Sequence, residues 1–254
     1  MTGTAPTGRR HRSHRLAALS GAVVLLLLAV AAVDPGASAG PVRTRVAPAS
    51  PSVTVTGTHL IVASATDPAT DGYWLAATDG GVFSFGAPFE GSAGALPLRS
   101  PVVGMAPTAD GLGYRLVAAD GGVFAYGDGA FLGSMGGLPL NRPVVGMAAT
   151  PDGKGYWLVA SDGGIFAFGD APFLGSMGAV PLNRPVVGMQ AAGDGYRLVA
   201  ADGGLFSYGT PFAGSAVGLL QRRAVSLDTS GAGYRIVSSN GSVFAFGGAA
   251  YLGA

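Results

Sequence analysis

Two series of side chains recur at regular spacing in this sequence and could contact a ligand. The first follows a repeated tyrosine and alternates between tryptophan and arginine, at Trp74, Arg115, Trp157, Arg197 and Arg235. Both residue types offer a flat face suited to a sugar ring or an aromatic partner. The neighbouring positions hardly vary in type, so packing does not dictate one shape here. We predict ligand contact at this series, with side chains lying over the adjacent repeat as the alternative.

A second series stands just before each following repeat, at Arg99, Arg142, Arg184 and Arg222. Four guanidinium groups in equivalent places would lie on one rim, where they could bind anionic groups such as wall phosphates or uronates. The alternative, which we favour, is that each arginine bonds carbonyl groups or a turn aspartate of a neighbouring repeat.

Candidate catalytic acids are few. A glycosidase needs two carboxyl groups of unequal pKa at a defined separation. Glu90 breaks the repeat, because the other copies carry leucine or alanine there, and Asp71 or Asp228 could be its partner. An exposed charge at a strand end explains Glu90 without catalysis. A glycan hydrolase or lyase is therefore the least favoured function, and we assign no catalytic residue.

Composition and charge exclude several other classes. The chain has no cysteine, which removes disulfides, cysteine zinc sites and thiol nucleophiles. No calcium loop is present, and we expect no metal or cofactor. Beyond Ala39, 11 basic and 13 acidic groups are left, without a clustered basic face. Nucleic-acid binding is therefore not expected.

The candidate residues lie in a unit that occurs five times. The copies are marked by a Gly-Tyr pair at nearly even spacing, with the tyrosines at Tyr73, Tyr114, Tyr156, Tyr196 and Tyr234. Downstream of each tyrosine, at a constant offset, comes a short polar residue, at Asp79, Asp120, Asp162, Asp202 and Asn240. Asp and Asn share turn chemistry, so this series predicts structural turns.

Four short β-forming runs are predicted in each unit. In the third copy they begin at Val144, Tyr156, Ile165 and Phe173. Asp162 and Gly163 suit a two-residue hairpin turn in which both residues take positive φ. Both faces of the runs are apolar, as expected for sheets stacked between similar sheets.

Four strands per unit, repeated radially, is the plan of a β-propeller. We therefore predict an all-β fold, with one five-bladed propeller over residues 59–254. The run 61–66 could complete the sheet that ends at Ala254. An open solenoid is the alternative architecture.

The N-terminal segment 1–39 predicts an export signal. Four arginines precede an uncharged run over residues 16–33, and the small residues 37–39 predict cleavage after Ala39. The uncharged run also reaches the lower limit of length for a spanning helix, so an uncleaved membrane anchor is the alternative. Residues 40–58, rich in Pro, Ala, Ser and Thr, predict a flexible lead-in. Both alternatives place the repeats outside the cytoplasm.

The unit GYWLVASDGGIFAFGDAPFLGS, which starts at Gly155, resembles the tandem repeat of secreted actinobacterial proteins. That resemblance covers the five copies. It implies propeller-like domains that often accompany cell-wall or other extracellular modules, and it implies no catalytic residues.

These observations predict a secreted, non-enzymatic binding module that recognises carbohydrate or cell-envelope material at repeated sites. We expect a monomer. The alternative is an extracellular protein-interaction scaffold, because the repeats contain no polar constellation typical of an active site.

Overall fold

The computed structural model describes residues 60–253. The predicted signal peptide (1–39), its cleavage site at Ala39 and the lead-in (40–58) lie outside the described residues. Within residues 60–253 every helix-or-strand element is a strand, so the all-β prediction is confirmed there. No helix capable of crossing a membrane is found in this part of the chain.

Fifteen strands form five three-stranded antiparallel sheets, each built from consecutive strands. The sheets are β1 (Ile61–Thr66), β2 (Tyr73–Ala77) and β3 (Val82–Phe85); β4 (Val102–Pro107), β5 (Gly113–Ala118) and β6 (Val123–Gly127); β7 (Val144–Ala149), β8 (Gly155–Ala160) and β9 (Ile165–Gly169); β10 (Val186–Ala192), β11 (Gly195–Ala200) and β12 (Leu205–Tyr208); and β13 (Ala224–Ser230), β14 (Gly233–Ser238) and β15 (Val243–Phe246).

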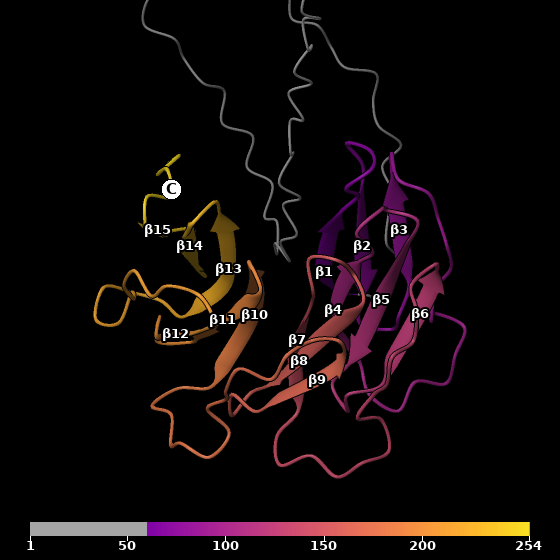
Figure 1. The fold of residues 1–254 in the computed structure, drawn as a ribbon, viewed down its shortest axis with the longest axis horizontal. Coiled ribbons are helices and arrows are strands. Elements are labelled where there is room, and N and C mark those ends of the chain that lie inside the picture. The colour runs from indigo at the N-terminus through magenta and orange to yellow at the C-terminus, as the bar shows by residue number, and fades with distance from the viewer. Residues whose placement is uncertain (1–59, 254) are drawn as a thin grey trace, which may run out of the picture.

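The sheets follow one another in chain order around an arc (Figure 1). The first strand of each sheet is the inner one, because β1 lies beside β4, and β4, β7, β10 and β13 continue that series. All five inner strands line one central cavity of about 90 Å³. The arrangement is therefore β-propeller-like.

Close packing of these sheets explains the apolar character of both strand faces. Every residue of β8 is buried, because its sheet lies between two others. The inner strands approach so closely that a Cβ on Gly104 would lie 3.4 Å from the backbone of Met147 in the next inner strand. Small residues at the inner edge therefore allow neighbouring sheets to meet.

The predicted fourth strand is wrong. Phe173 and Leu174 lie in an irregular segment after β9. The Leu174 N–H donates to the Tyr196 hydroxyl at 3.1 Å, and the Gly175 carbonyl accepts from the same hydroxyl at 2.6 Å. Because a tyrosine of the next sheet satisfies this backbone, the segment does not extend the edge of its own sheet.

The hairpin turn is placed one residue earlier than predicted. The Gly163 N–H donates to the Ala160 carbonyl, which makes Ser161 and Asp162 the central residues of the turn. Gly163 follows them with φ of 81°, a conformation in which a β-carbon would strain the backbone. The Asp162 carboxylate accepts from the Gly164 N–H at 3.0 Å, and equivalent bonds occur in the other four repeats.

The first strand does not complete the last sheet, which the sequence had left as one possibility. β1 instead pairs with β2, and the register shifts once between Ile61 and Ala63. Successive sheets are joined by backbone bonds at the start of each inner strand, as where the Val144 N–H donates to the Ala119 carbonyl.

Replacing Asp162 tests the turn. Asp162→Ala should lower the free energy of unfolding by about 0.5–1.5 kcal/mol, because the Gly164 N–H loses its acceptor. Asp162→Asn should cost much less, since Asn240 occupies this place in the fifth repeat. Urea unfolding measures both. Asp194→Ala, which removes an exposed loop carboxylate, is the control, and equal losses in all three variants would contradict the turn role.

Candidate functional site

The Trp and Arg series does not lie on the surface as predicted. Trp74 and Trp157 are 0% exposed, and Arg115 and Arg197 are 1% exposed. Arg235 is half-buried and forms an ion pair with Asp228 at 3.0 Å. Side chains buried in this way offer no flat face to a ligand, which favours the alternative of packing against the adjacent repeat.

Each of these side chains donates a hydrogen bond to a loop carbonyl of its own repeat. Trp157 Nε1 donates to the Pro172 carbonyl at 2.8 Å, and Arg115 Nε donates to the Ala130 carbonyl at 2.8 Å. The same bond is made by Trp74 to Pro88, by Arg197 to Pro211 and by Arg235 to Ala250. Trp and Arg exchange at this position because each supplies an N–H on a long flat side chain.

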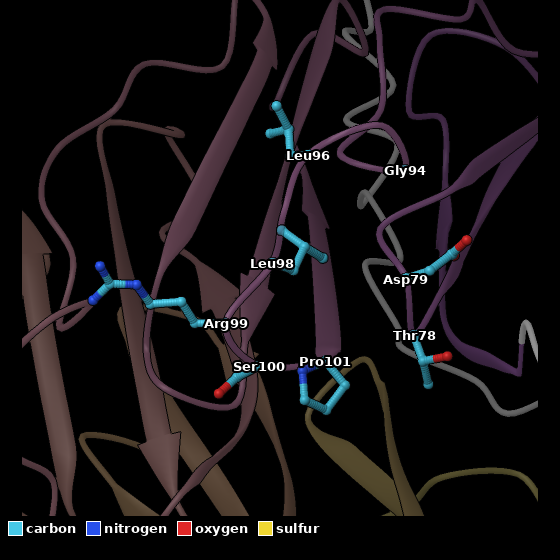
Figure 2. Close-up of a pocket in the computed structure, with 8 residues that line it drawn as sticks. All are labelled: Thr78, Asp79, Gly94, Leu96, Leu98, Arg99, Ser100 and Pro101. Atoms are coloured by element: carbon cyan, nitrogen blue, oxygen red, sulfur yellow. The ribbon is translucent and has the colours of Figure 1, made fainter.

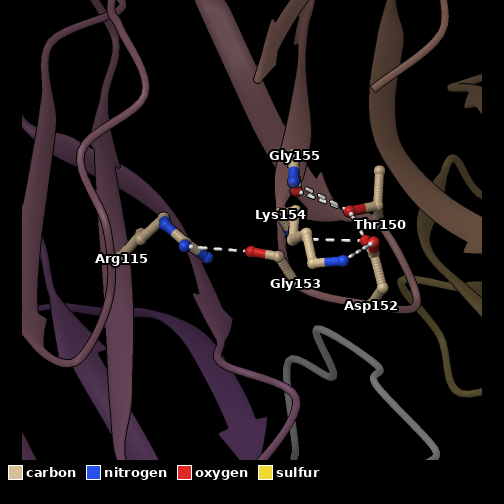
Figure 3. A network of polar contacts seen from close by, with 6 residues as sticks. All are labelled: Arg115, Thr150, Asp152, Gly153, Lys154 and Gly155. Atoms are coloured by element: carbon tan, nitrogen blue, oxygen red, sulfur yellow. Dashed lines mark hydrogen bonds and ion pairs between the residues drawn. The ribbon is translucent and has the colours of Figure 1, made fainter. Parts of the chain in front are cut away.

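In the first four repeats this side chain also contacts a tyrosine of the following sheet. The Trp157 and Tyr196 rings lie 5.2 Å apart, and the Arg115 guanidinium lies 5.3 Å from the centre of the Tyr156 ring. The arginines reach further than tryptophan can. Arg115 Nη2 donates to the Gly153 carbonyl of the next sheet at 3.2 Å (Figure 3).

In the second to fifth sheets, the tyrosine hydroxyl bonds the loop that follows the outer strand of the preceding sheet. This is the same loop whose carbonyl accepts from the Trp or Arg side chain. The Tyr156 hydroxyl donates to the Gly133 carbonyl at 2.6 Å and accepts from the Leu132 N–H at 3.2 Å. Tyr114, Tyr196 and Tyr234 make the same pair of bonds. Burial raises the pKa of Tyr156, so its hydroxyl stays protonated as a donor.

An exposed aromatic residue lies between these two contacts in the first four repeats and at the equivalent place in the fifth. The five side chains are 59–62% exposed: Phe89, Phe131, Phe173, Phe212 and Tyr251. In the first four, the carbonyl before the aromatic residue and the N–H after it are both held by the buried contacts. For Tyr251 only the Arg235 bond to Ala250 is present. A signal for this series exists in the sequence, because an aromatic residue is kept in all five repeats within a segment that lacks strand alternation.

The second arginine series lies at the opposite end of the inner strands from the β7–β8 loop. Arg99, Arg142, Arg184 and Arg222 are exposed. The favoured expectation of bonds to carbonyls or turn aspartates is not met, since none of the four side chains forms a hydrogen bond or ion pair within residues 60–253. Figure 2 shows Arg99 on the rim of a pocket of about 390 Å³, across from Asp79.

The structure does not bring the least favoured catalytic candidates together as a carboxylate pair. Glu90 is half-buried beside Gly127, in the segment between the first two sheets. Asp228 is paired with Arg235 in the fifth sheet. No hydrogen bond links Glu90 to Asp71 or Asp228 in the described part of the chain. Nor does any group of three or more metal-ligating residues occur there.

Two other carboxyl groups do interact. Asp110 and Asp128 line one cleft of about 280 Å³ between the second and third sheets, with Arg115 and Lys154. Partial desolvation in this cleft, followed by the hydrogen bond with Asp110, raises the pKa of Asp128. The hydroxyl of Thr108 and the Leu112 N–H lower the pKa of Asp110. Sequence periodicity did not indicate this pair, because its members come from two loops of one sheet.

Comparisons with solved proteins give distant similarities. The chain is similar to BBS1N, solved in complex with ARL6DN, with a TM-score of 0.45 and 12% identity over 69% of this chain and 56% of that chain. It is also similar to human WBSCR16, with a TM-score of 0.40 and 18% identity over 69% of this chain and 59% of that one. The chain thus spans less than two thirds of either protein. No protein-family model and no curated protein matches it.

Removing one tyrosine hydroxyl tests the inter-sheet contact. Tyr156→Phe should lower the free energy of unfolding by about 1–3 kcal/mol, because the Gly133 carbonyl and the Leu132 N–H lose their partner. Tyr251→Phe is the matched control, since the Tyr251 side chain is 62% exposed and its hydroxyl forms no hydrogen bond within residues 60–253. Chemical denaturation of both variants measures the difference. Equal losses would contradict the proposed importance of the contact.

The carboxyl pair predicts a dependence on pH. A raised pKa means that the folded state favours protonated Asp128 over ionised Asp128. The protonated carboxyl group therefore stabilises the fold at low pH, and this stabilisation is lost as the pH rises through the folded pKa. Asp128→Asn should therefore stabilise the protein slightly at neutral pH, and the gain should vanish below the folded pKa of Asp128. Urea unfolding across the acid range measures this, and a gain that persists at low pH would contradict the coupling.

Proposed function

We propose that this protein is a non-enzymatic five-bladed β-propeller that binds carbohydrate or cell-envelope material outside the cytoplasm. One observation carries the proposal: an exposed aromatic side chain stands at the same place in all five repeats. A single exposed apolar residue needs no explanation. Five in equivalent positions on a rigid frame provide repeated contacts of the kind a polymer with a repeating structure can use.

The geometry of the loops supports binding through ring faces. Sugar rings carry apolar C–H faces that stack on aromatic side chains, and phenylalanine and tyrosine lose little conformational freedom on binding. The backbone beside Phe131 is already fixed by Arg115 and Tyr156. A loop held in its binding conformation lowers the entropy lost on association. Several weak contacts to one chain then add through multivalency.

Five blades require a closing contact between the first and fifth sheets. Two features of the described residues support such a contact. Arg235 already holds the Ala250 carbonyl as Arg115 holds that of Ala130. Tyr73 is 42% exposed, whereas its four counterparts are fully buried. We propose that the Tyr73 hydroxyl bonds the loop after the outer strand of the fifth sheet, as the Tyr156 hydroxyl bonds the loop of the second sheet.

Export from the cytoplasm is proposed from the sequence of residues 1–39, by cleavage after Ala39 or through an uncleaved anchor. The second candidate function is an extracellular protein-interaction scaffold. Exposed aromatic and arginine side chains favour it, because both types are enriched in protein interfaces. The same aromatic series would serve either ligand, so binding assays must include both.

Substitution of the aromatic series tests the proposal. The purified protein is incubated with insoluble polysaccharides and cell-envelope fractions, and the free fraction is measured. Phe131→Ala should weaken binding by about two- to tenfold, the value of one aromatic contact. Replacement of all five aromatic residues by alanine should abolish it. Leu138→Ala, an exposed apolar change at the other end of the repeat, is the control for binding to the polysaccharides.

Two results would contradict the carbohydrate proposal. Full binding by the variant without the five aromatic residues would remove their role. An absence of binding to every glycan and envelope fraction, together with capture of a defined extracellular protein that depends on the same five residues, would favour the scaffold.

A further inference from the structure

The two ends of the inner strands carry different charges. At the starts of β4, β7, β10 and β13 stand five exposed arginines, which we call the arginine rim: Arg99, Arg142, Arg184, Arg222 and Arg223. Within residues 60–253 none of their side chains forms a hydrogen bond or ion pair. The hairpin turns lie at this same end, and their four aspartates are half-buried, as Asp162 is. In each turn one carboxylate oxygen accepts a backbone N–H.

The opposite end is acidic. Its loops, which join the inner to the middle strands or follow the outer strands, carry six exposed aspartates that we call the aspartate rim: Asp71, Asp110, Asp128, Asp152, Asp170 and Asp194. Lys154 is the exposed cation among them, and it lies 3.5 Å from Asp152. An anionic surface would therefore attract the arginine rim and repel the aspartate rim, which fixes one orientation of the molecule.

Aliphatic side chains accompany the arginines. Shortly before Arg99, Arg142, Arg184 and Arg222 in the sequence stand the exposed side chains of Leu96, Leu138, Val180 and Leu219. They lie at the arginine rim because their loops are bonded to its hairpin turns, as where the Met135 N–H donates to the Gly121 carbonyl and the Leu138 N–H to the Met135 carbonyl. A soluble polyanion would pair with the arginines but would leave these aliphatic groups in water.

The chain also enters the fold at this rim. Leu60, the first described residue, accepts a hydrogen bond at its carbonyl from the Thr78 N–H at the end of β2. Upstream in the sequence is the uncharged run 16–33, preceded by four arginines. The described part of the chain therefore begins at the arginine rim.

We propose that the arginine rim docks on an anionic lipid surface. The guanidinium groups pair with phosphate headgroups, and the aliphatic side chains enter the boundary between headgroups and acyl chains. This orientation turns the aspartate rim away from the membrane. The exposed aromatic series follows the outer strands at the aspartate-rim end, so it remains free for a ligand. The docking does not depend on the identity of that ligand.

Single cysteine labels test the proposal in the full chain, which contains no cysteine of its own. Leu138→Cys places a polarity-sensitive fluorophore at the arginine rim. Leu112→Cys places it in the β4–β5 loop at the aspartate rim, and both leucines are 57% exposed. Each labelled protein is mixed with vesicles of phosphatidylcholine alone or with added phosphatidylglycerol. We expect a blue shift at position 138 with phosphatidylglycerol, no shift at position 112, and loss of the shift at high salt.

Arginine variants separate charge from general apolar adsorption. Replacing Arg99, Arg142, Arg184 and Arg222 by glutamine in the Leu138→Cys protein should abolish the shift, and replacement by lysine should retain most of it. Circular dichroism confirms that both variants fold. Equal shifts at positions 138 and 112, or no shift with phosphatidylglycerol, would overturn the proposal. A shift caused by soluble polyuronate but not by vesicles would assign the rim to an anionic glycan instead.

Discussion

The fold depends on a tyrosine hydroxyl that bonds two backbone groups of the preceding sheet. Without a fourth strand, the segment after each outer strand has carbonyl and N–H groups with no strand partner, and such groups are costly when buried. Tyr156 satisfies two of them at Gly133 and Leu132. One side chain thus replaces a strand, joins two sheets and fixes the position of Phe131. Four joints of this kind make the spacing of the repeats regular.

The exchange between tryptophan and arginine at the position after each repeated tyrosine follows from this contact between sheets. Each side chain must span the same gap, donate an N–H to a loop carbonyl and lie against the next tyrosine. A buried guanidinium loses solvation, which lowers the pKa of Arg115 and Arg197, and some of their nitrogens have no hydrogen-bond partner within residues 60–253. The contact with a tyrosine ring offsets part of that loss. Tryptophan avoids it but cannot reach the carbonyl of the next sheet.

The repeats give the molecule two unlike ends. Antiparallel pairing sends every hairpin turn and every inner-strand start to one end, so a residue kept at one place in the repeat becomes a ring in space. Arginines before the inner strands gather at that end, and aspartates of the other loops gather at the opposite one. A charged residue type that recurs at one position of the repeat therefore gives one end of the molecule a different charge from the other.

The sequence by itself determined the all-β class, the five copies, three strands of each copy and the turn positions to within one residue. Local chemistry sets these features: β-forming residues alternate with Asp-Gly or Asn-Gly turns, and apolar residues occupy both strand faces. Tertiary structure alone decided which residues are exposed. Trp157 and Phe173 are both aromatic members of the repeat, yet one is buried and the other lies on the surface. Their exposure differs because the next sheet covers the side chain of Trp157 but bonds only the backbone beside Phe173. The position of a neighbouring sheet is set by tertiary packing, so no pattern within a single copy predicts it.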